Sequence, residues 1–568
     1  MTPVIETDVL VIGSGAGGLS AAVTAAHNGL RVIVAERTQV LGGATAWSGG
    51  WMWVPRNPLA RRVGIDEDRD APRTYLQAVI GNRFDAARVD AFLDSGPEMI
   101  KFFESHTKLQ FDDGNTIQDI YGDLPGAGTG GRSIIARPIN GRAVGALLKL
   151  VRMPMRETSL WGLPIQAGPD LRAFLTATRK LASFLHVARR VSRHLFDLVI
   201  HGRAMQLANG NALVARLVVS GADLGVRFMT DAPATGLLVE DGCVVGAILQ
   251  QAGQSLTVTA KSGVVVATGG FSNNSARRAT LFPHSGDGSQ HWSLPPASVS
   301  GDGVALVEAA GGVLDTNVEA TGAWCPVSLV PYADGTVGHF PHIIDRGKPG
   351  LIAVRANGRR FVNEANGYHD YVRALLAATG PDEAAESWLI ADAKFVARYG
   401  LGFVKPWPFR IGPWIKRGYL KRAPTIAELA QECGIDPTGL EATVEAFNVN
   451  ARNGTDPDFN RGASLYNRYQ GDPDVAPNPT LGPIENGPFF AMKVVSGSFG
   501  SFAGVRTDAV ARALDANDAP IPGLYVVGSD MASIMGGHYP AGGINLGPAM
   551  TFGFIAGCDI AARAGATK

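Results

Sequence analysis

The sequence predicts an α/β fold in which a Rossmann-type nucleotide-binding domain is built from two separate stretches of chain. Three observations predict it. A short apolar run near the N-terminus is followed by glycines and then by a helical pattern of small residues. Two further apolar runs, at residues 262–267 and 521–527, each end in glycines. Since strands from both ends of the chain would complete one nucleotide site, we expect an α+β domain inserted between them.

The domain limits follow from these strands. We expect residues 1–275 and 500–568 to form the discontinuous nucleotide-binding domain, and residues 276–499 to form a substrate or cap domain. The chain has 568 residues, of which 46% are hydrophobic, so it can bury more than one core and is not disordered. Its 71 glycines are nearly twice the average share, which indicates many tight turns or close approaches to a ligand.

Composition also excludes several classes of protein. The 51 Lys and Arg balance the 51 Asp and Glu, which argues against a nucleic-acid-binding protein. The four cysteines are too far apart for a CxxC motif, so we expect no metal site, and reduced thiols in a cytoplasmic protein. The N-terminus lacks the basic segment of a signal peptide, and no uncharged run of 18 apolar residues predicts a membrane span.

The N-terminal segment carries a complete dinucleotide fingerprint. The strand at 8–12 is followed by the glycine turn, a helix, a second strand and Glu36. Gly13 permits the tight turn, Gly15 lets backbone N–H groups approach a pyrophosphate at the helix N-terminus, and Gly18 lets the helix pack on the strand. Glu36 is expected to accept a hydrogen bond from a ribose hydroxyl.

Further segments complete the predicted cofactor site, at residues 42–50, 262–270 and 521–530. This arrangement resembles FAD flavoproteins of the glutathione-reductase-like Rossmann class, which implies FAD and places Gly528 and Asp530 at its pyrophosphate or ribityl part. No His or Cys stands where attachment can be argued, so we expect FAD to be held non-covalently. The predicted cofactor-binding residues are Gly13, Ser14, Gly15, Ala16, Gly17, Gly18, Glu36, Arg37, Gly42, Gly43, Thr45, Ser48, Gly49, Gly50, Ala267, Thr268, Gly269, Gly528, Asp530, Asn545 and Leu546.

The C-terminal segment 535–557, with Tyr-Pro-Ala-Gly-Gly at 539–543, narrows the family. It resembles the signature of the 3-ketosteroid Δ1-dehydrogenases (3-oxosteroid 1-dehydrogenases), within the fumarate reductase and succinate dehydrogenase-like flavoproteins. Segments 42–55, 125–134 and 359–375 resemble the same family in order along the chain.

This resemblance implies the catalytic residues. The Tyr539 hydroxyl and the Gly543 N–H would hold the substrate carbonyl, and each such donor stabilises the enolate-like charge by roughly 3 kcal/mol. Tyr368 would take a proton from carbon 2 while a hydride leaves carbon 1 for the flavin. A further tyrosine relays the proton in that family; one alignment register places Ile120 there and the other Tyr121. We favour Tyr121, because isoleucine passes no proton.

Two residues beside Tyr368, namely His369 and Asp370, could extend the relay, although a surface hydrogen-bonding role is the favoured interpretation of each. The resemblance thus implies an FAD-dependent 3-ketosteroid Δ1-dehydrogenase of steroid or sterol degradation, with a quinone-like or other electron acceptor. One alternative is a flavin enzyme for another ring ketone or enoate, either Δ4-directed or fumarate-reductase-like. The loop 538–547 has no arginine to clamp a dicarboxylate. Arg346 stands where the fumarate reductase branch has a catalytic arginine, but a role in a surface ion pair is equally open. The other alternative is a non-catalytic flavoprotein on a membrane surface.

Two stretches are basic and aromatic, at residues 151–203 and 401–422. The first contains apolar residues at helical spacing over 171–199, which predicts a basic amphipathic helix or a pair of helices. Such surfaces suit a membrane interface, so peripheral contact with the inner face of the cytoplasmic membrane is one interpretation. Packing within the protein and a contact in a homo-oligomer are the others.

Overall fold

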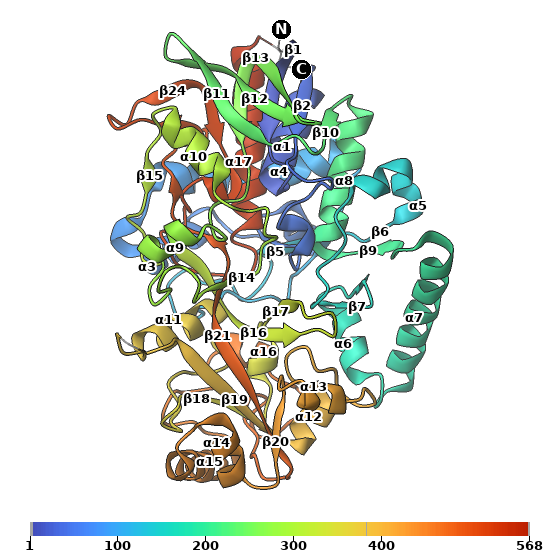
Figure 1. The fold of residues 1–568 in the computed structure, drawn as a ribbon, viewed down its shortest axis with the longest axis vertical. Coiled ribbons are helices and arrows are strands. Elements are labelled where there is room, and N and C mark those ends of the chain that lie inside the picture. The colour runs from blue at the N-terminus through green and yellow to red at the C-terminus, as the bar shows by residue number, and fades with distance from the viewer. Residues whose placement is uncertain (1–3, 382, 566–568) are drawn as a thin grey trace.

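The computed structural model describes residues 4–381 and 383–565, and Figure 1 shows a nucleotide-binding part above an elongated second part. The upper part is built on a parallel sheet in the order β10-β2-β1-β13-β24. Strand β24, near the C-terminus, pairs in parallel with β13, so the last stretch of chain completes the sheet of the first. The predicted α/β fold class is confirmed. The strands are β1 (Val4–Ile12), β2 (Val32–Ala35), β10 (Arg227–Met229), β13 (Gln254–Val266) and β24 (Pro520–Val526).

Apolar sequence explains this sheet. Val9, Leu10 and Val11 are fully buried, as expected for a parallel strand covered on both faces. Helix α1 (Ala16–His27) packs against α17 (Leu546–Arg563), and small residues allow the close approach. A Cβ added at Gly553 would lie 2.3 Å from the carbonyl oxygen of Gly17.

Smaller elements surround the sheet and carry the loops of the site. Antiparallel strands extend it, and a three-stranded sheet, β3-β5-β4, lies against helix α17 through β3. The antiparallel strands are β11 (Ala234–Glu240), β12 (Cys243–Gln251) and β23 (Arg512–Leu514), and those of the small sheet are β3 (Trp51–Trp53), β4 (Phe111–Asp113) and β5 (Ser133–Ala136). The helices are α2 (Pro58–Arg62), α3 (Asp70–Ile80), α4 (Ala86–His106), α5 (Gly141–Val144) and α8 (Asn209–Asp223).

The cap part is organised on a second sheet in the order β17-β16-β21-β19-β18, with β14 and β20 also paired to β21. Strand β21 (Phe489–Ser501) runs through the predicted domain boundary at 499/500. The other strands are β14 (Trp292–Ser293), β16 (Gly322–Pro331), β17 (Val337–Pro341), β18 (Leu351–Val354), β19 (Glu386–Asp392) and β20 (Lys421–Ala423). The helices from 275 to 470 are α9 (Ser275–Leu281), α10 (Asp302–Ala309), α11 (Tyr368–Ala377), α12 (Ala393–Tyr399), α13 (Gly412–Lys416), α14 (Ile426–Cys433), α15 (Pro437–Arg452) and α16 (Leu465–Gln470).

The stretch 151–203 forms a short hairpin, β7 (Ser159–Leu160) and β8 (Leu163–Pro164), followed by α6 (Pro169–Thr176) and α7 (Leu181–His201). The predicted pair of helices is therefore present, and α7 stands at the outside of the molecule (Figure 1). None of the helices in the described ranges is long and apolar enough to cross a membrane.

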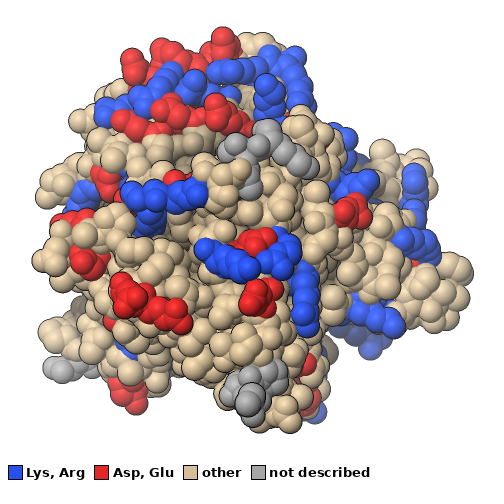
Figure 2. Space-filling model, turned by 90° about the horizontal axis from the view of Figure 1, so that it is seen from above, with Lys and Arg blue, Asp and Glu red and all other residues tan. Residues whose placement is uncertain are grey.

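All four cysteines are free. Seen from above, acidic and basic side chains are interspersed (Figure 2).

Candidate functional site

The glycine turn has the geometry that its sequence predicts. Gly13 has a φ of +104°, and a Cβ there would lie 2.2 Å from the carbonyl oxygen of Ala267. A Cβ at Gly18 would lie 2.3 Å from the Gly13 oxygen. Helix α1 begins directly after Gly15 and has no acidic residue in its first turn, so its N-terminal N–H groups can receive a phosphate.

Glu36 and Ser14 tie this turn to the loop 42–50. The buried Glu36 carboxylate accepts a hydrogen bond from the Ser14 hydroxyl at 2.6 Å, and that hydroxyl accepts one from the Gly42 N–H at 2.9 Å. The Ala16 N–H donates to the Thr45 hydroxyl at 3.0 Å. Strand, turn and loop are thus fixed relative to one another by hydrogen bonds within the protein.

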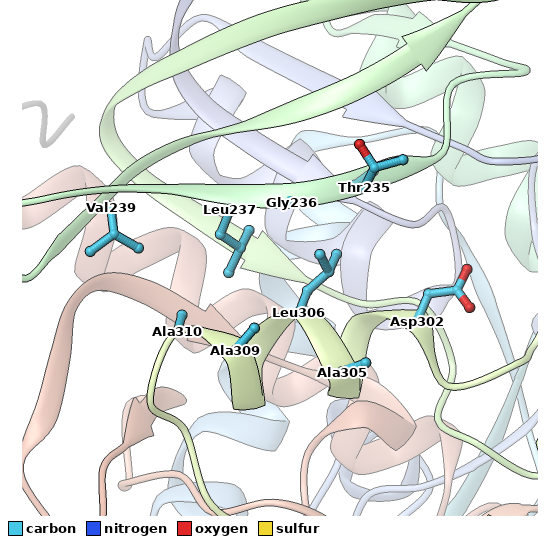
Figure 3. A pocket seen from close by; sticks show the side chains of 10 residues that line it. Thr235, Gly236, Leu237, Val239, Asp302, Ala305, Leu306, Ala309 and Ala310 are labelled. Carbon is cyan, nitrogen blue, oxygen red and sulfur yellow. The ribbon is translucent and has the colours of Figure 1, made fainter. Parts of the chain in front are cut away.

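Arg37 extends toward the second part of the chain. Its guanidinium donates to the Ser300 hydroxyl at 2.6 Å and pairs with Asp302 at 2.5 Å. Asp302 also borders a pocket of about 410 Å³ between the edge strand β11 and helix α10 (Figure 3). Its lining is mainly apolar, with residues such as Leu237 and Leu306, and includes none of the predicted site residues.

Asp530 is completely buried at the end of β24 and organises the loop after β13. Its carboxylate accepts hydrogen bonds from the Thr268 N–H, from the Thr268 hydroxyl at 3.0 Å, and from the N–H groups of Gly269 and Gly270 at 3.1 and 2.9 Å. Burial raises the pKa of Asp530, and these donors act in the opposite direction. The predicted contact of this carboxylate with the cofactor stays a prediction.

The open space in this region fits FAD. A Cβ built at Gly43, Gly49 or Gly528 meets no protein atom within 4 Å, so these predicted cofactor positions border free volume. Helix α17 starts with Leu546 after Asn545, and it has neither an acidic residue in its first turn nor a side-chain cap. Two helix N-termini whose N-cap side chains make no hydrogen bond to the helix are suited to a negatively charged group such as a pyrophosphate.

The two predicted catalytic tyrosines come from different parts of the chain and meet in the structure. Tyr368 is the first residue of α11, and Tyr539 lies in the loop before α17. Their ring centroids are 4.8 Å apart in an edge-to-face arrangement. Both are buried, with exposed fractions of 7% and 4%. Phe499 and Phe502 pack against Tyr368 and Tyr539, respectively, and make the surroundings apolar.

The surroundings of Tyr539 direct its hydroxyl proton outward. The Asn545 amide donates to the Tyr539 oxygen at 3.2 Å, and the Tyr368 hydroxyl forms a hydrogen bond with the same oxygen. Because the Asn545 amide donates to this oxygen, the Tyr539 hydroxyl keeps its own proton for another acceptor. Asn545, predicted as a cofactor contact, therefore touches Tyr539, a predicted catalytic residue.

Gly543 has the conformation and the free donor that its predicted role requires. Its φ is +102°, and a Cβ would lie 2.7 Å from the Trp53 nitrogen, so only glycine fits. Its carbonyl accepts hydrogen bonds from the N–H groups of Trp53 and Gly547. Within the described residues its own N–H has no acceptor among the backbone hydrogen bonds, and it can act as the second donor to a substrate carbonyl.

The two alignment registers at the relay position give two different environments. The Ile120 side chain lies against Gly367, next to Tyr368. The Tyr121 hydroxyl donates to the Asp370 carboxylate at 2.8 Å. The relay role of Tyr121 stays a prediction, and its hydrogen bond to Asp370 agrees with the predicted extension of the relay to that carboxylate.

His369 points elsewhere. It is fully buried, and its Nδ1 accepts a hydrogen bond from the Trp324 N–H at 3.1 Å, which ties the start of α11 to strand β16. Burial lowers its pKa well below the ordinary value, so the ring is neutral. Arg346 is also buried, with an exposed fraction of 1%, and donates to the backbone carbonyls of His342, Glu364 and Asn366. Among residues 4–381 and 383–565 it has no ion-pair partner at the surface.

Asp370 makes stability depend on pH. Burial raises its pKa from 3.8 to about 6, and the hydrogen bond from Tyr121 opposes the rise. Because the folded protein holds this proton at a higher pH than the unfolded chain, the stabilisation is complete below about pH 4 and is lost as the pH rises through 6. This corresponds to at most about 3 kcal/mol, which partial exposure reduces to about 1–2 kcal/mol.

We therefore expect Asp370→Asn, which has no titrating group, to gain in melting temperature relative to the wild type between pH 4 and pH 7. Melting curves of both proteins at four pH values measure this difference. A difference that stays constant across this range would show that Asp370 has an ordinary pKa.

Known proteins share this sequence and geometry over nearly the whole chain. The family model described as FAD binding domain matches residues 8–546. The 4-oxocyclohex-2-ene-1-carboxylate 5-dehydrogenase of Sinomonas cyclohexanicum is 40% identical over 99% of this chain and 95% of its own length. The 3-oxosteroid 1-dehydrogenase of Mycolicibacterium smegmatis is 35% identical over 99% of this chain and 98% of its own. The chain belongs to the 3-ketosteroid dehydrogenase family of FAD-binding flavoproteins.

The fold agrees with this family. The crystal structure of the 3-ketosteroid Δ1-dehydrogenase of Sterolibacterium denitrificans, in complex with 1,4-androstadiene-3,17-dione, matches with a TM-score of 0.91 at 33% identity. The match covers 98% of this chain and all of that one. The predicted FAD cofactor and the predicted class of FAD-dependent oxidoreductase acting on CH–CH groups are confirmed. The sequence did not predict a role for Tyr75, for Asp119 or for the partners of Arg132. The Gly-Gly-Arg motif that contains Arg132 could nevertheless be recognised in the sequence.

Proposed function

We propose that the protein is a 3-ketosteroid Δ1-dehydrogenase, which converts a 3-oxosteroid to its 1-ene. The pairing of Tyr368 with Tyr539 across the two parts of the chain, beside the Gly543 N–H, supports this most directly. Ketone chemistry needs a base for the α-proton and donors for the oxygen, and the site provides both in an apolar surrounding.

In the proposed reaction the substrate carbonyl accepts hydrogen bonds from the Tyr539 hydroxyl and the Gly543 N–H. Negative charge grows on that oxygen as Tyr368 takes the proton from carbon 2, and the two fixed donors stabilise it. When bound, FAD would supply the acceptor for the hydride of carbon 1, and loss of that hydride together with the proton of carbon 2 leaves the double bond between the two carbons. The residues that would hold FAD are those of the glycine turn, the loop 42–50 and the start of α17. A quinone-like acceptor would then reoxidise the enzyme.

Tyr368 needs help to act as a base. Burial, followed by the charge and hydrogen bond of Tyr539, raises its pKa well above the usual value, so its phenolate is not populated at neutral pH. The proton that it receives must therefore leave in the same step. We propose that it leaves through Tyr121 to Asp370, since Asp370, with a pKa of about 6, is mostly ionised at neutral pH.

An anaerobic titration tests the proposal. The purified flavoprotein would be mixed with androst-4-ene-3,17-dione, with 4-oxocyclohex-2-ene-1-carboxylate and with fumarate, and the flavin absorbance would be followed. Bleaching by the steroid and formation of its 1-ene support the proposal. No bleaching by the steroid, together with turnover of fumarate by the reduced enzyme, would exclude it.

A second candidate substrate is a monocyclic oxocyclohexene carboxylate. The relative at 40% identity carries that activity in its name, and its identity exceeds the 35% of the steroid enzyme. The same ketone donors and base would serve both substrates. Bleaching by the carboxylate at lower concentration than by the steroid would favour this candidate.

We further propose that α7 contacts a membrane. This helix differs from an ordinary surface helix, which buries its apolar side chains. In α7 the polar His194 and Asp197 are buried against the protein, and Asp197 pairs with Arg142 at 3.0 Å. The large apolar residues face outward instead. Those with the greatest exposure are Leu181, Phe184, Leu185, Leu195, Phe196, Val199 and Ile200.

A contact between two aromatic side chains connects the predicted basic stretches 151–203 and 401–422. Trp161, which is 60% exposed, packs against Phe409 at a centroid distance of 6.4 Å. Exposed cations, among them Arg179, Arg189 and Arg193, lie on the same helical insertion. Apolar side chains beside cations are the composition that binds an interface with anionic lipids.

Flotation with vesicles that contain anionic phospholipid tests this surface. The wild type should float at low salt. The triple variant Phe184→Ser, Phe196→Ser, Val199→Ser should lose at least about tenfold in vesicle affinity, because it removes apolar area that the membrane would bury. Val449→Ser is the matched control, since Val449 is 52% exposed on α15. Wild-type protein that stays in the soluble fraction at low salt would exclude the interaction.

A further inference from the structure

The loop that carries the two carbonyl donors is anchored at Pro540, directly after Tyr539. The Pro540 carbonyl accepts a hydrogen bond from the Tyr75 hydroxyl at 2.7 Å and another from the Ile120 N–H at 2.8 Å. Tyr75 is fully buried on α3, and Ile120 belongs to the segment before the 125–134 loop. Two donors on one carbonyl fix the peptide plane between Pro540 and Ala541, one residue after Tyr539.

The other end of the loop is anchored at Gly543. Its carbonyl accepts the Trp53 N–H at 3.1 Å, and the indole N–H of Trp53 donates to the Asp119 carboxylate at 2.9 Å. Asp119 immediately precedes Ile120, which binds Pro540. One short segment is therefore connected to both anchors of the 540–543 loop.

A buried ion pair holds this segment. The Arg132 guanidinium donates to the Asp119 carboxylate at 2.5 Å and also binds Glu67, and both Arg132 and Asp119 are 2% exposed. The guanidinium lies 5.9 Å from the Trp53 ring centre and 5.7 Å from that of Tyr75. The same cation thus contacts the residues that bind each end of the loop.

We infer that Arg132 and Asp119, acting through Tyr75 and Trp53, form a positioning unit for the loop 539–543. They set the directions of the Tyr539 hydroxyl and the Gly543 N–H, although none of the four touches the reacting atoms. This inference rests on the proposed function. Donors stabilise developing charge only when they are fixed before the reaction, and a displacement of about 1 Å at such a site lowers rates about 100-fold.

The variant Tyr75→Phe tests the anchor at Pro540. It keeps the ring beside Arg132 and removes the hydrogen bond to the loop, together with the one that the Tyr75 hydroxyl accepts from the Tyr121 N–H at 3.3 Å. We expect kcat to fall by about tenfold with KM within about twofold and with full FAD content, because the transition state depends on donor direction more than the ground state does. Tyr399→Phe is the control, since its hydroxyl donates at the same 2.7 Å to Asp472 in the cap.

Binding of a simple phenol separates positioning from a general structural role. Its phenolate resembles the charged oxygen of the enolate-like state, and its absorbance reports ionisation on binding. Tyr75→Phe should lose about tenfold in phenolate affinity and no more than about twofold in affinity for the neutral 1-en-3-one product. Equal losses for both ligands, or wild-type kcat, would overturn the inference. If no ring ketone reduces the wild-type flavin, the proposed function fails, and the phenol titration alone decides on the positioning unit.

Discussion

Tyr539→Phe is expected to lower kcat by about 100- to 1,000-fold while FAD remains bound. The substitution removes one of two donors to the carbonyl oxygen, and loss of one such donor costs about 3–4 kcal/mol of transition-state stabilisation. The buried ring stays in place, and KM should change only a few-fold, since the neutral ketone binds the hydroxyl weakly. Single-turnover flavin reduction, with FAD content from the absorbance ratio, measures both quantities.

The control for this variant is Tyr525→Phe in the same domain. The Tyr525 hydroxyl donates to Asp559, near the C-terminal end of α17, at 2.6 Å. Loss of this hydroxyl should leave kcat within about twofold. Tyr539→Phe also leaves the Asn545 amide without its acceptor and removes the hydrogen bond with Tyr368, which costs about 1–3 kcal/mol of stability. Near-normal kcat in the variant would remove Tyr539 from the mechanism.

The glycine turn and the strands around it could be predicted because their signals are local. The Gly-Ser-Gly-Ala-Gly-Gly sequence of residues 13–18 is enough to predict that Gly13 must be glycine. Its φ of +104° agrees with this prediction. The meeting of Tyr368 and Tyr539, by contrast, was implied by resemblance and not by spacing. Tyr368 begins helix α11 and Tyr539 lies in the loop before α17, and only the assembled fold brings their ring centroids within 4.8 Å.

Other features were beyond sequence reasoning for physical reasons. Ile120 and Tyr121 are neighbours, so alignment alone leaves two registers, and their different partners depend on how α11 packs. The contacts of Asp119 with Trp53 and Arg132 join separate loops, and no periodicity encodes them. Helix α7 had a visible apolar stripe, but periodicity does not say which face the rest of the protein covers.

Tyr368→Phe is expected to have an effect as large as that of Tyr539→Phe, for a different reason. Phenylalanine keeps the edge-to-face ring contact with Tyr539 but can accept no proton, and loss of a general base lowers rates by about 100- to 10,000-fold. Hydride transfer from carbon 1 would then proceed only as fast as another group or water removes the proton from carbon 2. Single-turnover flavin reduction with substrate deuterated at carbon 2 measures this step, and the isotope effect should increase in the variant.

Tyr371→Phe is the matched control on the same helix. Tyr371 is fully buried and its hydroxyl binds Ser387 at 2.8 Å, so its loss should cost about 1 kcal/mol of stability and leave turnover nearly unchanged.

The proposed relay adds a second expectation, which concerns the pH dependence of kcat. Because Asp370 must be ionised to receive the proton, wild-type kcat should rise with pH through about 6, and the slow turnover of Tyr368→Phe should not. If Tyr368→Phe kept the wild-type rate and pH profile, the proton would have to leave carbon 2 by a route that avoids α11.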